Sequence, residues 1–169
     1  SVVAALMPVL VGAFCAMTML AVLFILAHYV SLSIFTINIA LLLGLCLSLD
    51  YALFIISRFR EELPNSKNIE VIIARTIATA GKAVFFSGLA VFASLSALLI
   101  FPINILYSVG IGGLCAVFLA VLGALTLLPA ILSCLHHHVN ALMVFKFQNG
   151  KSVFWRTLAQ KVLQYPGIF

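Results

Sequence analysis

The sequence predicts an all-α membrane protein with four transmembrane helices and two short amphipathic helices on the cytoplasmic surface. Of the 169 residues, 65% are hydrophobic and only 8% are charged, which gives a mean hydropathy of +1.30. That composition leaves too little polar surface for a water-soluble domain of this size. The basic residues lie between and after long apolar runs, as they do in cytoplasmic loops. The net charge of +5 therefore does not indicate a nucleic-acid partner.

The first two apolar runs predict an antiparallel pair of spans. Residues 2–27 hold no charge and are long enough to cross a bilayer. Pro8 lies near the start of this run, where a missing backbone N–H is tolerated. A loop of only a few residues then leads into the second span, residues 33–57. Small residues in this span favour close helix packing: Gly44, Cys46, Ser48 and Ala52.

Residues 58–82 form the longest polar segment between spans. The first part, with Arg58, Arg60, Glu61 and Glu62, is predicted to anchor the second span at the cytoplasmic side. Residues 64–66 (Pro-Asn-Ser) break the helix, and either Ser66 or Asn68 can cap a new one. Apolar residues then recur at helical spacing: Ile69, Ile72, Ile73, Ile77 and Ala80. This pattern predicts a short amphipathic helix lying on the membrane surface.

Residues 83–101 and 105–128 are the third and fourth predicted spans. Each carries a stripe of small residues that predicts a packing face. The first stripe is Ala83, Ser87, Ala90, Ser94 and Ala97, and the second is Ser108, Gly112, Ala116 and Ala120. The Ser87 hydroxyl is also a candidate hydrogen-bond partner for an ionisable group. Pro129 is expected to close or kink the fourth span.

The last part of the chain returns to the positively charged side. We expect a transmembrane domain over residues 1–145 and a cytoplasmic linker with an amphipathic helix over residues 146–169. Residues 153–164 place a Trp beside basic residues, which suits the headgroup level. His136, His137 and His138 are interpreted as an interfacial basic patch, because consecutive helical residues cannot converge on one metal ion. The four cysteines are far apart in apolar runs and predict neither disulfides nor a zinc site.

Asp50 is the only one of the four acidic residues that lies inside an apolar run. A carboxylate at the middle of a span costs about 2.5–3.5 kcal/mol on insertion scales, so such residues usually have a task, such as relaying protons. The alternative is that Asp50 sits at the membrane edge and reaches water. Arg58 is eight residues away, about 12 Å along a helix, which favours the deep position. Tyr51 points about 100° round the helix from Asp50.

These residues resemble a known family. Residues 50–54 and 57–63 (DYALF and SRFREEL) are similar to the signature of the MMPL family, the mycobacterial membrane protein large group of the resistance-nodulation-division transporters. Residues 82–87 and 125–130 resemble the start of the next span and the end of the following one, and Phe154, Trp155 and Pro166 resemble the lead into the second half of the family's proteins. Cys46 and Ser48 stand where the family usually has glycines.

The resemblance implies a proton-driven exporter of lipids or other hydrophobic molecules in the inner or plasma membrane. Such proteins have two halves, each with six spans and an extracytoplasmic domain, and this chain would hold the third to sixth spans of the first half. Asp50 and Tyr51 would then form half of a proton relay, supported by Ser87. The implied partners are the bilayer, the missing second half, the extracytoplasmic domains and the lipid substrate, with a second copy of the chain as a further candidate. No cofactor is implied besides the coupling proton.

Two other classes of function compete with export. A lipid-sensing or scaffold module, like the sterol-sensing domains that share this helical arrangement, would not require a titrating acid at mid-membrane. A membrane enzyme is disfavoured, because the sequence has no HExxH or G-x-S-x-G motif and no acid pair in the membrane.

Overall fold

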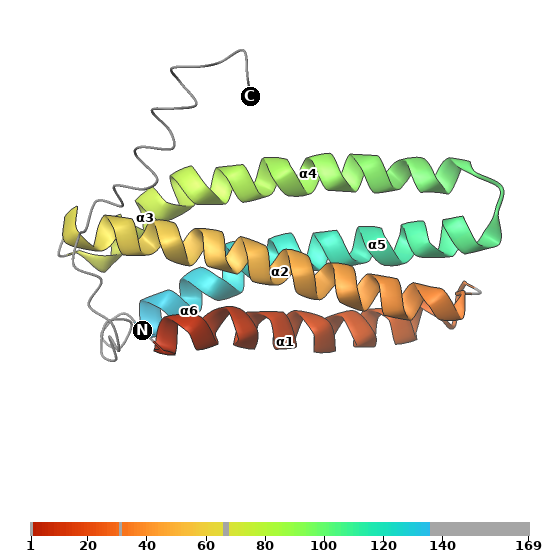
Figure 1. Cartoon of the computed structure of the whole chain (residues 1–169), viewed down its shortest axis with the longest axis horizontal. Helices are drawn as coiled ribbons and strands as arrows, with labels where there is room; N and C mark the ends of the chain where they lie inside the picture. The colour runs from red at the N-terminus through yellow and green to blue at the C-terminus, as the bar shows by residue number, and fades with distance from the viewer. Residues whose placement is uncertain (1, 31, 66–67, 136–169) are drawn as a thin grey trace, which may run out of the picture.

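The computed structural model describes residues 2–30, 32–65 and 68–135, which form a bundle of long helices running alternately in opposite directions (Figure 1). Four of these helices are long and apolar enough to cross a membrane: Leu6–Leu26, Ile34–Glu62, Ile69–Ile100 and Asn104–Ser133. The predicted four-span helical fold is thereby confirmed. The predicted linker, the helix over residues 153–164 and the histidines at 136–138 lie outside the described residues.

The first two helices form the predicted hairpin. Helix α1 (Val2–Leu26) runs through Pro8 without interruption, since a proline near a helix start removes an N–H that has no partner anyway. Helix α2 (Ile34–Glu62) begins at Ser33, whose hydroxyl accepts a hydrogen bond from the Phe35 N–H at 3.4 Å. It extends five residues beyond the predicted end at residue 57, because the helix is broken only where Pro64 follows.

The predicted surface helix after α2 is wrong. Helix α3 (Ile69–Thr76) starts at Asn68, one of the two predicted caps, but it does not end before the third span. It continues through a π-helical turn (Ile77–Gly81, the first π-turn) into α4 (Lys82–Ser96) and a 3₁₀ turn (Ala97–Ile100). No residue between Thr76 and Lys82 breaks the helix, and its apolar side faces protein, with Ile72 and Ala80 each only 3% exposed. The described residues therefore contain no separate amphipathic helix.

The fourth span is also longer than predicted. Helix α5 (Asn104–Leu122) passes through a second π-turn (Gly123–Leu127) into α6 (Leu128–Leu135). Pro129 therefore does not end the helix. The π-turn lies immediately before it, which suits a residue that cannot complete the regular α-helical hydrogen-bond ladder.

Helices α2 and α5 form the centre of the bundle through small residues. The predicted stripe of Ser108, Gly112, Ala116 and Ala120 is buried, which confirms it as a packing face. A Cβ atom at Gly112 would lie 2.5 Å from Thr36 Cγ2, and one at Gly44 would lie 3.6 Å from the Ala116 Cβ. Small side chains thus let the two backbones approach closely, as expected in a bilayer.

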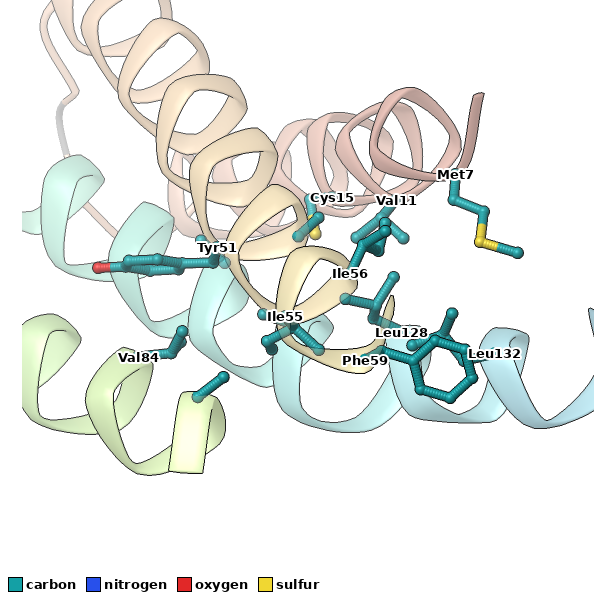
Figure 2. Close-up of a cluster of buried hydrophobic side chains, with 14 of the residues drawn as sticks. Met7, Val11, Cys15, Tyr51, Ile55, Ile56, Phe59, Val84, Leu128 and Leu132 are labelled. Carbon is teal, nitrogen blue, oxygen red and sulfur yellow. The ribbon is translucent and has the colours of Figure 1, made fainter. Parts of the chain in front are cut away.

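A cluster of buried apolar side chains fills the end of the bundle near Phe59 (Figure 2). Phe59 and Ile55 of α2 are fully buried, as is Leu128 of α6. Many large apolar side chains instead point outward, including Met17 and Phe24 at 71% exposure and Leu42 at 70%. An outer surface of this kind is unfavourable in water and suits contact with lipid.

Candidate functional site

Asp50 lies on the side of α2 that faces away from the other three helices. Its side chain is exposed, whereas Ser48 and Ala52 on either side of it in sequence are fully buried. The residues that share its face by helical spacing are also at least partly exposed: Cys46, Leu47, Leu53, Phe54 and Ser57. The carboxylate is therefore directed out of the described bundle, toward lipid or another protein element.

Tyr51 points in a different direction, into the bundle. Its side chain is only 7% exposed and belongs to the buried apolar cluster. In Figure 2 its ring extends sideways from α2, past α5 and toward the α4 side. The hydroxyl is buried and has no hydrogen-bond partner among the described residues. A buried hydroxyl without a partner costs about 1–3 kcal/mol, so this group is poised to accept a partner from outside the described chain or after a rearrangement.

Gly88 of α4 is the residue that the structure places against the Tyr51 hydroxyl. A Cβ atom at Gly88 would lie 3.8 Å from Tyr51 Oη and in severe overlap with Val121 Cγ2 on α5. Both Gly88 and Val121 also line an apolar groove of about 210 Å³ between α4 and α5. Sequence reasoning missed Gly88, although its spacing of four from the apolar Val84 is a signal that could have found it.

Ser87, the predicted support for the relay, is exposed, as are Ala83, Ala90, Ser94 and Ala97 of the same predicted stripe. Within the described chain this stripe is therefore not a packing face, and the prediction is wrong in that respect. The helix packs instead through its buried neighbours Val84 and Gly88. The small-residue stripe is left on the outside of the bundle, where a further helix can approach closely.

The predicted anchor residues meet at one end of the bundle. Arg58 donates from Nη1 to Glu61 Oε2 at 2.9 Å and from Nη2 to Glu62 Oε1 at 2.7 Å. Arg75 of α3 places Nη1 3.9 Å from Glu62 Oε2, a contact that the sequence did not predict. Arg60 lies exposed. We call this the charged end of the bundle.

The two ion pairs of Arg58 differ in their surroundings. The Glu61 side chain is 62% exposed, so that pair contributes little, about 0.2–1 kcal/mol for a surface pair. The Glu62 side chain is only 10% exposed, and a buried carboxylate needs a partner to offset its lost hydration. Glu62 is therefore the residue that makes Arg58 structurally important.

The described part of the chain holds no group of three or more His, Cys, Asp or Glu side chains placed to bind a metal ion. The chemistry available here is thus that of one outward carboxyl group, one buried phenol and a charged end. A carboxyl group and a phenol can each donate or accept a hydrogen bond in at least one protonation state.

Comparison with known proteins identifies the same family as the residues around Asp50. The MMPL family model matches residues 1–169. The trehalose monomycolate exporter MmpL3 of Mycobacterium tuberculosis (strain ATCC 25618 / H37Rv) is 39% identical over 143 residues, which is 85% of this chain and 15% of that protein. The putative membrane protein SCO6666 of Streptomyces coelicolor is 43% identical over 107 residues, covering 63% of this chain and 15% of that protein.

A second named exporter is also similar. The mycolic acid-containing lipids exporter MmpL11 of Mycolicibacterium smegmatis is 34% identical over 133 residues, or 79% of this chain and 14% of that protein. The chain thus spans about 15% of the length of the curated relatives it matches. With a family model matched along the whole sequence and four long apolar helices in the structure, this multi-pass membrane chain belongs to the MMPL family.

Proposed function

We propose that this chain is part of a proton-driven exporter of lipids or other hydrophobic molecules, in which Asp50 and Tyr51 form half of the proton relay. Relatives that share 34–39% identity with it are named as exporters of trehalose monomycolate and of mycolic acid-containing lipids. The observation that carries the proposal is the placement of Asp50, a lone acid within an apolar span whose side chain points out of the bundle.

The outward direction of Asp50 fits a relay shared between two halves of a transporter. A carboxylate left against lipid would be unfavourable, and burial against a second set of helices would give it a partner. Ser57 and Cys46 lie on the same face and are small, so a partner helix can come close to the carboxyl group. A proton moving across 100 mV releases about 2.3 kcal/mol, which is the energy such a relay would use.

Tyr51 has the role of second proton-carrying group in this proposal. Its hydroxyl can donate or accept a hydrogen bond, and both capacities are unused among the described residues. Because Asp50 and Tyr51 face different sides of α2, each would meet a different group of the second half or of a rearranged bundle. Ser87, exposed on α4, is a candidate to contact that second half.

The proposal includes an orientation in the membrane. Residues 58–82 and 146–169 would face the cytoplasm, because they hold most of the basic residues and cytoplasmic loops retain Lys and Arg. Residues 1–145 would form the transmembrane domain. The second half and the extracytoplasmic domains are the proposed protein partners.

The test is export by the full-length protein carrying Asp50→Asn, compared with the parent. Surface lipids are compared between a strain lacking the gene and strains complemented with each variant. Asn keeps the shape of Asp but cannot titrate, so export should be lost although the protein is made and inserted normally. Asp50→Glu should keep part of the activity, and Tyr51→Phe should reduce it. Export at the parental level by Asp50→Asn would rule out the relay and leave Asp50 as a structural polar contact.

A further inference from the structure

Arg58 links α2 to the first π-turn as well as to its own helix. In addition to its two carboxylate contacts, its Nε donates to Thr79 Oγ1 at 3.3 Å. Thr79 is the middle residue of the first π-turn, Ile77–Gly81. The two Glu contacts hold the guanidinium group in place, so the charged end of α2 is fixed to a specific point on the neighbouring helix.

Thr79 also contacts the backbone of its own helix. Its hydroxyl lies 2.9 Å from the Arg75 carbonyl oxygen and 3.3 Å from that of Thr76, in position to donate to either. The hydroxyl therefore connects the π-turn to the last residues of α3. The second π-turn offers a natural comparison, because Thr126 makes the same kind of back-bond to the Leu122 carbonyl at 2.6 Å but lies on a different helix.

The first π-turn sets which residue of α4 faces Tyr51. A π-turn contains one residue more than the α-helical turn it replaces. If it became α-helical while α3 stayed in place, each residue of α4 would occupy the position now held by the residue that follows it, a rotation of about 100°. Ser87 would then stand where Gly88 stands now, against the Tyr51 hydroxyl that has no partner.

We propose that Arg58 is a positioning residue for the Tyr51 site: by holding Thr79 it keeps the first π-turn in place, and this turn decides whether Gly88 or Ser87 faces the Tyr51 hydroxyl. The π-helical state places Gly88 there because Val121 leaves no room for a Cβ atom. The α-helical state requires α4 to move away from Val121, and it offers Tyr51 a hydroxyl partner in return. Helix α4 is the element that moves, since only Val84 and Gly88 of its 15 residues are buried.

Conversion of the first π-turn to an α-helical turn would shift the register of α4 by one residue. This shift adds a structural step to the proposed relay, and it can be measured without measuring transport. It is measured as distances between pairs of spin labels in the full-length protein, with its cysteines replaced and the protein held in lipid nanodiscs. The first pair is Leu42→Cys on α2 with Ser94→Cys on α4. Both positions are exposed, and Ser94 follows the first π-turn in the chain. The second pair is Phe54→Cys on α2 with Val71→Cys on α3. Both positions are exposed, and Val71 precedes the first π-turn in the chain.

Thr79→Val and Arg58→Gln should each give the first pair a second distance population. A 100° rotation at a radius of 5–6 Å displaces the label by on the order of 8 Å. Thr79→Ser keeps the hydroxyl and should restore the single parental distance, and Thr126→Val should leave it unchanged. The second pair should not respond to any of these substitutions.

Three results would overturn the proposal. A single parental distance for the first pair in both Thr79→Val and Arg58→Gln would show that the contact does not hold the register. An equal response of the first pair to Thr126→Val would show that the effect is not specific to the first π-turn. Broadening of both label pairs together would mean that the contact only holds the bundle together. The outcome is independent of whether Asp50→Asn abolishes export, so the two proposals fail separately.

Discussion

The Tyr51 hydroxyl oxygen lies 3.8 Å from the point that a Cβ atom would occupy at Gly88, so α2 and α4 meet where α4 has no side chain. Asp50, one residue earlier, is exposed on another side of α2. The two residues with proton chemistry therefore belong to different surroundings, one inside the bundle and one on its outer face. Predictions about Tyr51 can thus be tested through the packing of this chain, whereas those about Asp50 need the rest of the transporter.

Gly88→Ala should destabilise the bundle. The added methyl group would overlap Val121 Cγ2, and a valine in a helix has few alternative rotamers, so α4 and α5 must separate at a cost of about 1–3 kcal/mol. Gly12→Ala is the control, because its nearest neighbours would be at an ordinary 3.4 Å. The measurement is the temperature at which detergent-solubilised protein loses its single, symmetric peak in size-exclusion chromatography. Equal temperatures for the two variants would contradict the close approach at Gly88.

Ser87→Leu and Ser108→Leu should fail at different stages. Ser108 is 2% exposed within the α5 packing stripe, so a leucine there should prevent this chain from folding. Ser87 is exposed, so Ser87→Leu should leave the 169-residue chain as stable as the parent but reduce the yield of assembled full-length protein, where the second half is proposed to pack. Yields and thermal stability of the chain and of the full-length protein are compared. Normal assembly of full-length Ser87→Leu would remove this stripe from the interface with the second half.

The orientation in the membrane can be read from thiol labelling of intact cells. In a cysteine-free background, Arg60→Cys at the charged end should resist an impermeant reagent added outside, because that end is proposed to face the cytoplasm. Tyr29→Cys, at a position 84% exposed between α1 and α2, should react. Both sites should react after the cells are permeabilised. Labelling of Arg60→Cys from outside would reverse the proposed topology.

The span count, the hairpin of α1 and α2, and the different directions of Asp50 and Tyr51 could be predicted because hydropathy and helical period report them directly. Which small-residue stripe packs inside could not. Lipid is as apolar as a protein core, so the Ser87 and Ser108 stripes look alike in sequence, although only the second is buried. The continuous Ile69–Ile100 helix was missed for a related reason: isoleucines spaced to lie on a membrane surface are equally spaced to pack on α2 and α6.

The contacts of the charged end and of Tyr51 were beyond sequence reasoning because they join distant segments. Arg58 of α2 meets Thr79 inside a π-turn of the neighbouring helix, and a π-turn has no reliable sequence signature comparable to a proline or a cap. Gly88 of α4 likewise faces Tyr51 from a different helix. The family itself was recognised correctly from residues 50–63, and the match along the whole sequence confirms it.

The most direct test of the account is proton movement in inverted membrane vesicles that contain the full-length protein. A proton gradient is established by respiration, and a pH-sensitive dye reports proton movement when the lipid substrate is supplied. The parent should show substrate-dependent proton movement that an uncoupler abolishes. Asp50→Asn, present at the same level and equally folded, should show none, because Asn cannot carry a proton. Parental substrate-dependent proton movement in Asp50→Asn would contradict the relay and leave Asp50 as a structural contact with the second half.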